Sequence, residues 1–223
     1  MARKNAKKIK EIEKVIKILK NEVKRFKKPV VKNVSYDKDP FLVLISCILS
    51  LRTKDNVTEK ASERLFRIAR TPQKMLKLNV KKIEREIYPV GFYKTKARRI
   101  KEISKTIVKK YKGKVPDKIE ELLKLKGVGR KTANIVLEFG YNKAALPIDT
   151  HCHRIPNRIG WIKTKTPDET EKRLRKLLPK RLWKDFNNTF VVFGQNICLP
   201  VSPLCSKCPI NKYCKRINVK RSR

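Results

Sequence analysis

Apolar residues recur through most of this chain at intervals of three and four, the spacing that places side chains on one face of an α-helix. Residues 1–28 show this pattern within a basic background, at Ile9, Ile12, Ile16, Leu19, Val23 and Phe26. We expect this segment to form a helix that docks on a core. The alternative is a basic arm that becomes ordered only on a polyanion, but the apolar stripe favours docking.

The most apolar stretch, Phe41 to Leu49, predicts a central helix that is buried on nearly all sides. Asp39-Pro40 before it supplies an N-cap and a proline at the first helical position. Further stripes and caps predict helices over residues 57–68, after Thr71-Pro72, after Asn79, over 94–111, after Pro116-Asp117, over 166–178 and over 181–196. Because no stretch alternates with a period of two, the predicted fold is all-α.

Charge changes this picture from a helical protein to one with a polyanionic partner. The chain has 59 Lys and Arg against 20 Asp and Glu, a net charge of +39. A chain this basic repels itself unless a polyanion binds it, so nucleic acid is the leading partner. An anionic membrane surface is a weaker candidate because the basic residues are spread along the whole chain. Heat adaptation alone is disfavoured, because Glu does not match the Lys content.

The basic start of the chain, MARKNAKKIK, lacks the apolar segment of a signal peptide. The run from Phe41 to Leu49 is far shorter than the roughly 20 residues that span a bilayer. We therefore expect an intracellular protein, cytoplasmic or nucleoid-associated, with no transmembrane segment and no membrane partner. In that environment cysteines are more often metal ligands or core residues than disulfides.

Four of the six cysteines form a C-x6-C-x2-C-x5-C motif near the C-terminus: Cys198, Cys205, Cys208 and Cys214. Four thiolates in so short a span predict a metal site. Zinc sites commonly use two short knuckles, and only Cys205 and Cys208 form one here. The wider loops favour a 4Fe-4S cluster over zinc, which remains the alternative. Cys47 and Cys152 lie outside the motif and are interpreted as buried core thiols.

The segment from Lys124 to Thr150 combines a glycine hairpin, a lysine and an acid. Gly127 and Gly129 flank Val128, and glycine permits a tighter turn than any residue with a Cβ. The N–H groups at the start of the following helix predict an anion site. Lys131 lies in the first turn of that helix, and Asp149 follows after a loop.

LKGVGRKTANIVL, then PIDTH, then the four-cysteine motif resemble the endonuclease III family of DNA glycosylases and AP (abasic site) lyases. The resemblance implies two helical domains with a DNA-binding cleft between them and a helix-hairpin-helix motif. One would be a six-helix domain over residues 33–143 that ends in the hairpin. The other would join residues 1–32 to 144–223 and hold the iron–sulfur cluster. Relatives of this kind usually act as monomers.

The same resemblance assigns Lys131 as the nucleophile that forms a Schiff base with the sugar. Asp149 would assist its deprotonation and offset positive charge on the sugar. The alternative interpretations are that Lys131 only contacts a phosphate and that Asp149 is only a helix N-cap. The implied function is a bifunctional glycosylase in base excision repair, which excises oxidised or damaged pyrimidines and cleaves the strand 3′ to the site by β-elimination.

The implied partner is double-stranded DNA that contains damaged bases or abasic sites. The expected DNA-binding residues are Leu51, Arg52, Gly127, Val128, Gly129, Arg130 and His151. Leu51 stands where relatives most often have a glutamine that fills the gap left by the extruded nucleotide, so we expect weaker discrimination of the opposite base. The loop LPVSPL lacks the basic residues common in relatives, and the tail from Lys215 to Arg223 is a candidate substitute.

Three enzymatic alternatives remain: an adenine glycosylase, a mismatched-thymine glycosylase and an 8-oxoguanine lyase. Lys131 disfavours the first two, and the four cysteines disfavour the third. A basic, metal-stabilised nucleic-acid-binding module without catalysis accounts for the charge, the hairpin and the cysteines. It does not account for Lys131 and Asp149 at their spacing.

Overall fold

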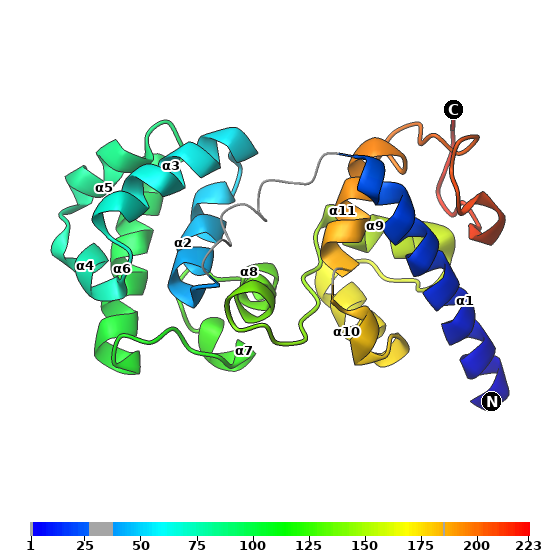
Figure 1. Cartoon of the computed structure of the whole chain (residues 1–223), viewed down its shortest axis with the longest axis horizontal. Coiled ribbons are helices and arrows are strands. Elements are labelled where there is room, and N and C mark those ends of the chain that lie inside the picture. The colour runs from blue at the N-terminus through cyan, green and yellow to red at the C-terminus, as the bar shows by residue number, and fades with distance from the viewer. Residues whose placement is uncertain (1, 27–37, 185) are drawn as a thin grey trace. The chain divides into compact units, whose positions relative to one another are not determined.

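The computed structural model describes residues 2–26, 38–184 and 186–223, and the chain divides into two compact units. Residues 30–145 form the unit that we call the hairpin unit. Residues 1–29 and 146–223 form the second, the cysteine unit. All regular elements among the described residues are helices (Figure 1), so the all-α prediction is confirmed for them.

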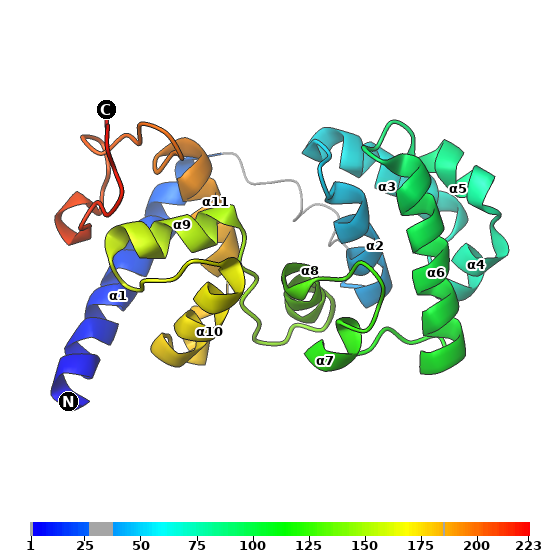
Figure 2. The same ribbon diagram turned by 180° about the vertical axis from the view of Figure 1, so that it is seen from behind.

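The hairpin unit is built around α2 (Pro40–Ser50), whose residues from Phe41 to Leu49 are all buried. Asp39 begins this helix as predicted, since its Oδ1 accepts hydrogen bonds from the amides of Phe41 at 2.7 Å and Leu42 at 3.2 Å. Both views place α2 between α6 and α8 (Figures 1 and 2). The other helices of the unit are α3 (Asp55–Ile68), α4 (Pro72–Lys77), α5 (Val80–Ile87), α6 (Tyr93–Tyr111), α7 (Ile119–Leu122), α8 (Arg130–Ile135) and the π-helical turn η3 (Val136–Gly140).

The helix before the hairpin begins close to Pro116-Asp117, as predicted, although Asp117 is not its N-cap residue. The helix α7 begins at Ile119, and its N-cap residue Lys118 makes no side-chain capping bond. The Asp117 carboxylate instead accepts a hydrogen bond from Lys143 Nζ at 2.5 Å. This ion pair joins the segment before α7 to the loop that follows η3.

The cysteine unit buries the apolar stripe of α1 (Ala2–Glu22), in which Ile12, Val15 and Leu19 are completely buried. These side chains belong to the same core as the aromatic residues of α11 (Phe186–Asn196). The predicted docking of the N-terminal helix on a core is therefore confirmed. The remaining elements are η1 (Val23–Arg25), α9 (Thr150–Ile159), α10 (Pro167–Leu177), η4 (Lys180–Leu182) and η5 (Asn211–Tyr213).

The aromatic helix predicted over residues 181–196 is shorter in the structure. A 3-10 turn, η4, covers Lys180–Leu182, and α11 begins at Phe186. The indole N–H of Trp183 donates to the carbonyl of Leu178 at 3.0 Å. This bond draws Trp183 back toward the end of α10, which requires a tight turn rather than a continuous helix.

Within the described parts of the chain, no helix is both long enough and apolar enough to cross a membrane.

Candidate functional site

The helix-hairpin-helix motif is formed by α7, a tight turn and α8. The Val128 amide donates to the carbonyl of Leu125 at 3.0 Å and closes the turn. Gly127 has φ of +80°, a backbone conformation that favours glycine, and a Cβ there would in addition displace the Arg99 side chain, whose Nη1 would lie 2.4 Å away. A Cβ at Gly129 would meet no atom within 4 Å. The backbone at Gly129 therefore faces open space that an external group can enter.

Lys131 is exposed and lies in the first turn of α8, directly after this hairpin. Its charge acts on Cys47, a thiol of the central helix α2. Burial raises the pKa of Cys47 to about 12, and the positive charge of Lys131 opposes that rise. Cys47 is buried, as expected for a core thiol.

The loop between α2 and α3 carries the predicted DNA contacts Leu51 and Arg52. The Leu51 side chain is 47% exposed, and the Arg52 guanidinium lies 5.9 Å from the centroid of the Phe92 ring. Both are in the hairpin unit with Lys131. Phe92, in the segment between α5 and α6, is itself exposed.

Asp149 is the N-cap of α9, in the cysteine unit. Its Oδ1 accepts hydrogen bonds from the amides of His151 at 2.9 Å and Cys152 at 2.8 Å. The capping role that the sequence suggested is therefore confirmed. Its pairing with Lys131, which belongs to the other unit, stays a prediction.

His151 is half-buried, and its ring packs against α11. A Cβ at Gly194 would lie 2.3 Å from His151 Nδ1, so only glycine permits this approach. The Arg154 guanidinium lies 3.0 Å from the same ring nitrogen and donates to the carbonyl of Cys198 at 2.7 Å. His151 is thus held in place through Arg154 and the first cysteine of the motif.

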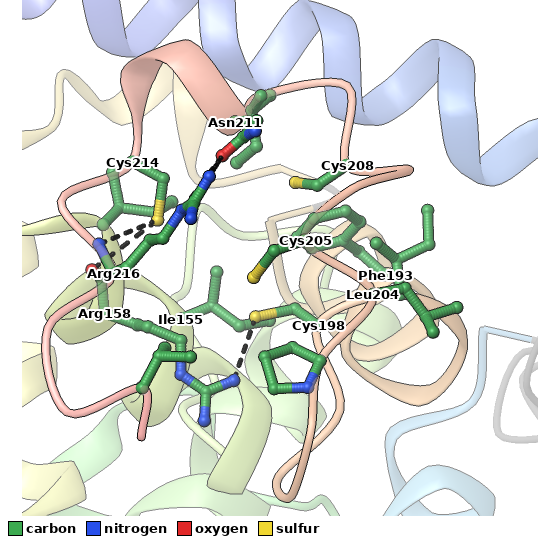
Figure 3. A pocket seen from close by; sticks show the side chains of 15 residues that line it. Ile155, Arg158, Phe193, Cys198, Leu204, Cys205, Cys208, Asn211, Cys214 and Arg216 are labelled. Carbon is green, nitrogen blue, oxygen red and sulfur yellow. Dashed lines mark hydrogen bonds between the residues drawn. The ribbon is translucent and has the colours of Figure 1, made fainter. Parts of the chain in front are cut away.

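All four cysteines of the motif line one pocket in the cysteine unit, and Figure 3 shows their sulfur atoms turned toward it. The open space measures about 380 Å³, including the solvent at its mouth. Much of the remaining wall is apolar: Ile155, Ile159, Phe193, Ile197, Leu204 and Ile210. Such a wall limits the access of water to a group bound among the thiols.

Polar groups around this pocket donate hydrogen bonds to the sulfur atoms of the first and last cysteines of the motif. The Arg158 Nη1 donates to Cys198 Sγ at 3.3 Å and to the carbonyl of Leu199 at 2.8 Å. The Arg216 amide donates to Cys214 Sγ at 3.4 Å. Hydrogen bonds of this kind orient ligands and stabilise negative charge on sulfur.

Burial raises the pKa of Cys208 to about 11, and negative charge on the other three cysteines adds to the rise. A cation bound among the four sulfurs would remove this repulsion. Within the described residues, no three His, Cys, Asp or Glu side chains are gathered closely enough to hold a single metal ion. The four thiols that line one pocket fit a metal group in their chemistry.

The basic tail folds back along the cysteine loop. The Arg223 amide donates to the carbonyl of Pro203 at 2.9 Å, and its carbonyl accepts from the Ser206 amide at 3.0 Å. The Ile217 amide donates to the carbonyl of Arg158 at 2.9 Å. The side chains of Lys215, Arg216 and Arg221 are exposed.

Two charged residues next to these sites were missed by the sequence reasoning. Lys96 and Arg158 are only 6% and 8% exposed. A signal was available for both, since Lys96 precedes Ile100 by four positions and Arg158 follows Ile155 by three. That spacing places each charge on the apolar face of its helix.

The sequence comparisons point to one family. Residues 45–180 match the HhH-GPD superfamily of base excision DNA repair proteins. Endonuclease III of Thermotoga maritima is 55% identical over 179 residues, which cover 80% of this chain and 84% of that protein. Endonuclease III-like protein 1 of Mus musculus is 42% identical over 175 residues, 77% of this chain. This chain spans only 58% of the longer mouse protein.

Solved structures agree with the sequence comparisons. A non-covalent endonuclease III–DNA complex superposes with a TM-score of 0.81 at 31% identity, covering 93% of this chain and 95% of that one. A thermostable thymine-DNA glycosylase superposes with a TM-score of 0.82 at 26% identity, covering 95% of this chain and 97% of that one. This chain belongs to the endonuclease III family of DNA glycosylases and AP lyases, within the HhH-GPD superfamily.

Proposed function

We propose that this protein excises oxidised or ring-damaged pyrimidines from duplex DNA and then cleaves the strand as an AP lyase, with Lys131 as nucleophile. The observation that carries the proposal is the place of Lys131. It is an exposed lysine in the first turn of the helix that follows the hairpin glycines. Membership of the endonuclease III family supports the reaction class, and the preference for pyrimidine lesions is the finer part of the proposal.

In the proposed reaction the neutral amine of Lys131 attacks C1′ of the damaged nucleotide. The N-glycosidic bond breaks, and the base leaves with its bonding electrons and takes up a proton. The sugar ring opens to a Schiff base between C1′ and Lys131. Loss of a proton from C2′ then breaks the C3′–O bond and releases the 3′ phosphate, and water hydrolyses the Schiff base to regenerate the lysine.

We assign Asp149 two roles, a helix cap and a catalytic carboxylate. One oxygen, Oδ1, accepts both capping bonds. The carboxylate would accept the proton of the Lys131 amine and offset the positive charge that develops on the sugar as the base departs.

The mutation Asp149→Asn separates these two roles. Asparagine caps helices as well as aspartate, so we expect little change in the melting temperature. The single-turnover rate of base excision should fall about 100-fold or more, the usual contribution of a positioned acid or base. Asp39→Asn is the matched control, because Asp39 caps α2 in the same way. An Asp149→Asn variant that excises at the wild-type rate would show that the carboxylate is only a cap.

DNA would be held by the hairpin amides of Gly127, Val128 and Gly129, with the open space at Gly129 leaving room for a phosphate. Arg52, Arg130, His151 and the basic tail would add contacts to the backbone. Leu51 would enter the gap left by the extruded nucleotide, as apolar wedges do in bent DNA. It offers no hydrogen bond to the orphaned base, so the identity of that base should matter little.

Cys198, Cys205, Cys208 and Cys214 would hold a 4Fe-4S cluster, which supplies a covalent brace for the end of the chain. The uneven loops of the C-x6-C-x2-C-x5-C motif favour a cluster over a single ion, and zinc is the alternative. Arg158 would hold the loop that follows Cys198 and stabilise charge on its sulfur. No step of the reaction is assigned to this group.

Borohydride trapping of the wild-type protein tests the proposed function. Duplexes with thymine glycol, an abasic site, 8-oxoguanine, or a G·T mismatch are each incubated with protein and reductant. A covalent adduct on the first two duplexes is the expected result, because the reductant fixes the Schiff base. Base release without any adduct would indicate a monofunctional glycosylase, and a duplex bound without either would indicate a binding module. Either result would overturn the proposal.

A further inference from the structure

Lys96 is a buried lysine whose amine is held by hydrogen bonds inside the fold. It lies in the first turn of α6 and is only 6% exposed. Burial lowers the pKa of its amine from 10.5 to about 8. Burying an ammonium is costly unless its hydrogen bonds are satisfied, so its acceptors indicate what the residue does.

Three oxygen acceptors surround the Lys96 amine. Nζ donates to the carbonyl of Leu49 at 2.7 Å, to the carbonyl of Leu51 and to Thr53 Oγ1 at 3.0 Å. An ammonium has three donors and no acceptor, so the group is fully used. The carbonyls at the end of a helix lack intrahelical donors, and a cation there is favoured by the helix dipole. Lys96 therefore caps the C-terminal carbonyls of α2 and also binds the loop that follows this helix.

The same loop is fastened from a second side through Thr53. Its hydroxyl oxygen accepts from Lys96 Nζ and from the Gly91 amide at 3.2 Å, and the hydroxyl donates to the Leu51 carbonyl at 3.3 Å. One donor and two acceptor sites are all that a hydroxyl has. A Cβ at Gly91 would lie 2.7 Å from the Arg52 carbonyl oxygen, so the two backbones are in direct contact.

The geometry points to Lys96 as a positioning residue that holds the Leu51–Thr53 loop in the shape in which Leu51 projects into solvent, ready to fill the gap left by an extruded nucleotide. The inference deepens the proposed function and rests on it for the role of Leu51. The Leu51 carbonyl before Arg52 and the Thr53 hydroxyl after it are both bound, whereas the Leu51 side chain remains 47% exposed. A side chain on a backbone held by such bonds is better positioned for insertion into a base stack than one on a loosely held loop.

The variants Lys96→Met and Thr53→Val remove the fastening in two different ways. Methionine keeps the length of the side chain without its donors, and valine keeps the shape of threonine without its hydroxyl. Thr53→Ser retains the hydroxyl and should restore wild-type behaviour. Lys101→Met is the matched control, since Lys101 also lies on α6 and donates to two carbonyls at a helix end, those of Leu76 and Leu78.

Two substrates separate positioning from chemistry. A thymine-glycol duplex requires nucleotide extrusion, whereas an abasic site in a single-stranded oligonucleotide has no stacked base to displace. For Lys96→Met and Thr53→Val we expect single-turnover excision from the duplex to fall about tenfold or more, because misplaced positioning groups cost up to about 100-fold. Borohydride trapping on the single-stranded abasic site should stay at the wild-type level. Lys101→Met and Thr53→Ser should match the wild type on both substrates.

Hydrogen exchange at the amides of residues 52–54 gives a readout that does not depend on activity. Both loosening variants should exchange faster there, with unchanged protection in α6. Equal losses on the two substrates, or unchanged exchange in the loop, would overturn the inference. If the wild-type protein forms no adduct on any substrate, the proposed function fails, and the exchange result still decides whether Lys96 fastens the loop.

Discussion

Replacing Lys131 with alanine should abolish the borohydride-trapped adduct and lower the single-turnover rate of strand cleavage by a factor on the order of 10³ or more, the scale of loss seen when a nucleophile is removed. Alanine has no amine, so neither the attack at C1′ nor the Schiff base can occur. Lys131 is exposed in the first turn of α8, and alanine is a better helix former than lysine. The melting temperature should therefore not fall.

Lys126→Ala is the matched control for this experiment. Lys126 is an exposed lysine of the same hairpin segment, and its Nζ lies 3.4 Å from Glu102 Oε1 in a surface ion pair. Its loss should weaken DNA binding slightly and leave the adduct intact, since single surface ion pairs contribute little. An adduct of normal yield in Lys131→Ala, or one lost equally in Lys126→Ala, would remove Lys131 from the role of nucleophile.

The second large effect is expected for Cys208→Ser. Serine is a poor ligand for iron, so the variant should be purified without the visible absorbance of an iron–sulfur cluster and with little bound iron. Metal binding free energy is also folding free energy in sites of this kind, with a value of about 10 kcal/mol or more for small zinc domains. We therefore expect the cysteine unit to unfold at a markedly lower temperature.

Cys152→Ser controls for the loss of a thiol as such. Cys152 is completely buried in the same unit but does not line the pocket. Its replacement should lower stability through a buried hydroxyl and leave the iron content unchanged. Zinc in place of iron in the wild-type protein would contradict the cluster, and full iron in Cys208→Ser would exclude Cys208 as a ligand.

Helix beginnings were predicted well because capping is local. Asp39, Thr71, Asn79 and Thr166 each accept a hydrogen bond from an amide two or three residues later in the chain. Asp117 shows the limit of such reasoning, because its carboxylate pairs with Lys143, 26 residues away, and Lys118 occupies the N-cap position of α7. Trp183 likewise shortens the aromatic helix through its hydrogen bond to the Leu178 carbonyl, which the spacing of apolar residues does not predict.

The hairpin with Lys131, the cap at Asp149 and the four-cysteine motif were all visible in the sequence, because each depends on residues a few positions apart. The tertiary structure alone decided how these parts are held. In the structure the charge of Lys131 acts on Cys47 of α2, and the ring of His151 packs against Gly194. Arg158 donates a hydrogen bond to Cys198 Sγ. The tertiary structure also turned Lys96 from one of many lysines into the bond donor that fastens the Leu51 loop. The reason is physical: spacing along a helix predicts which face a side chain occupies, but only the packing of the elements decides which residue contacts it there.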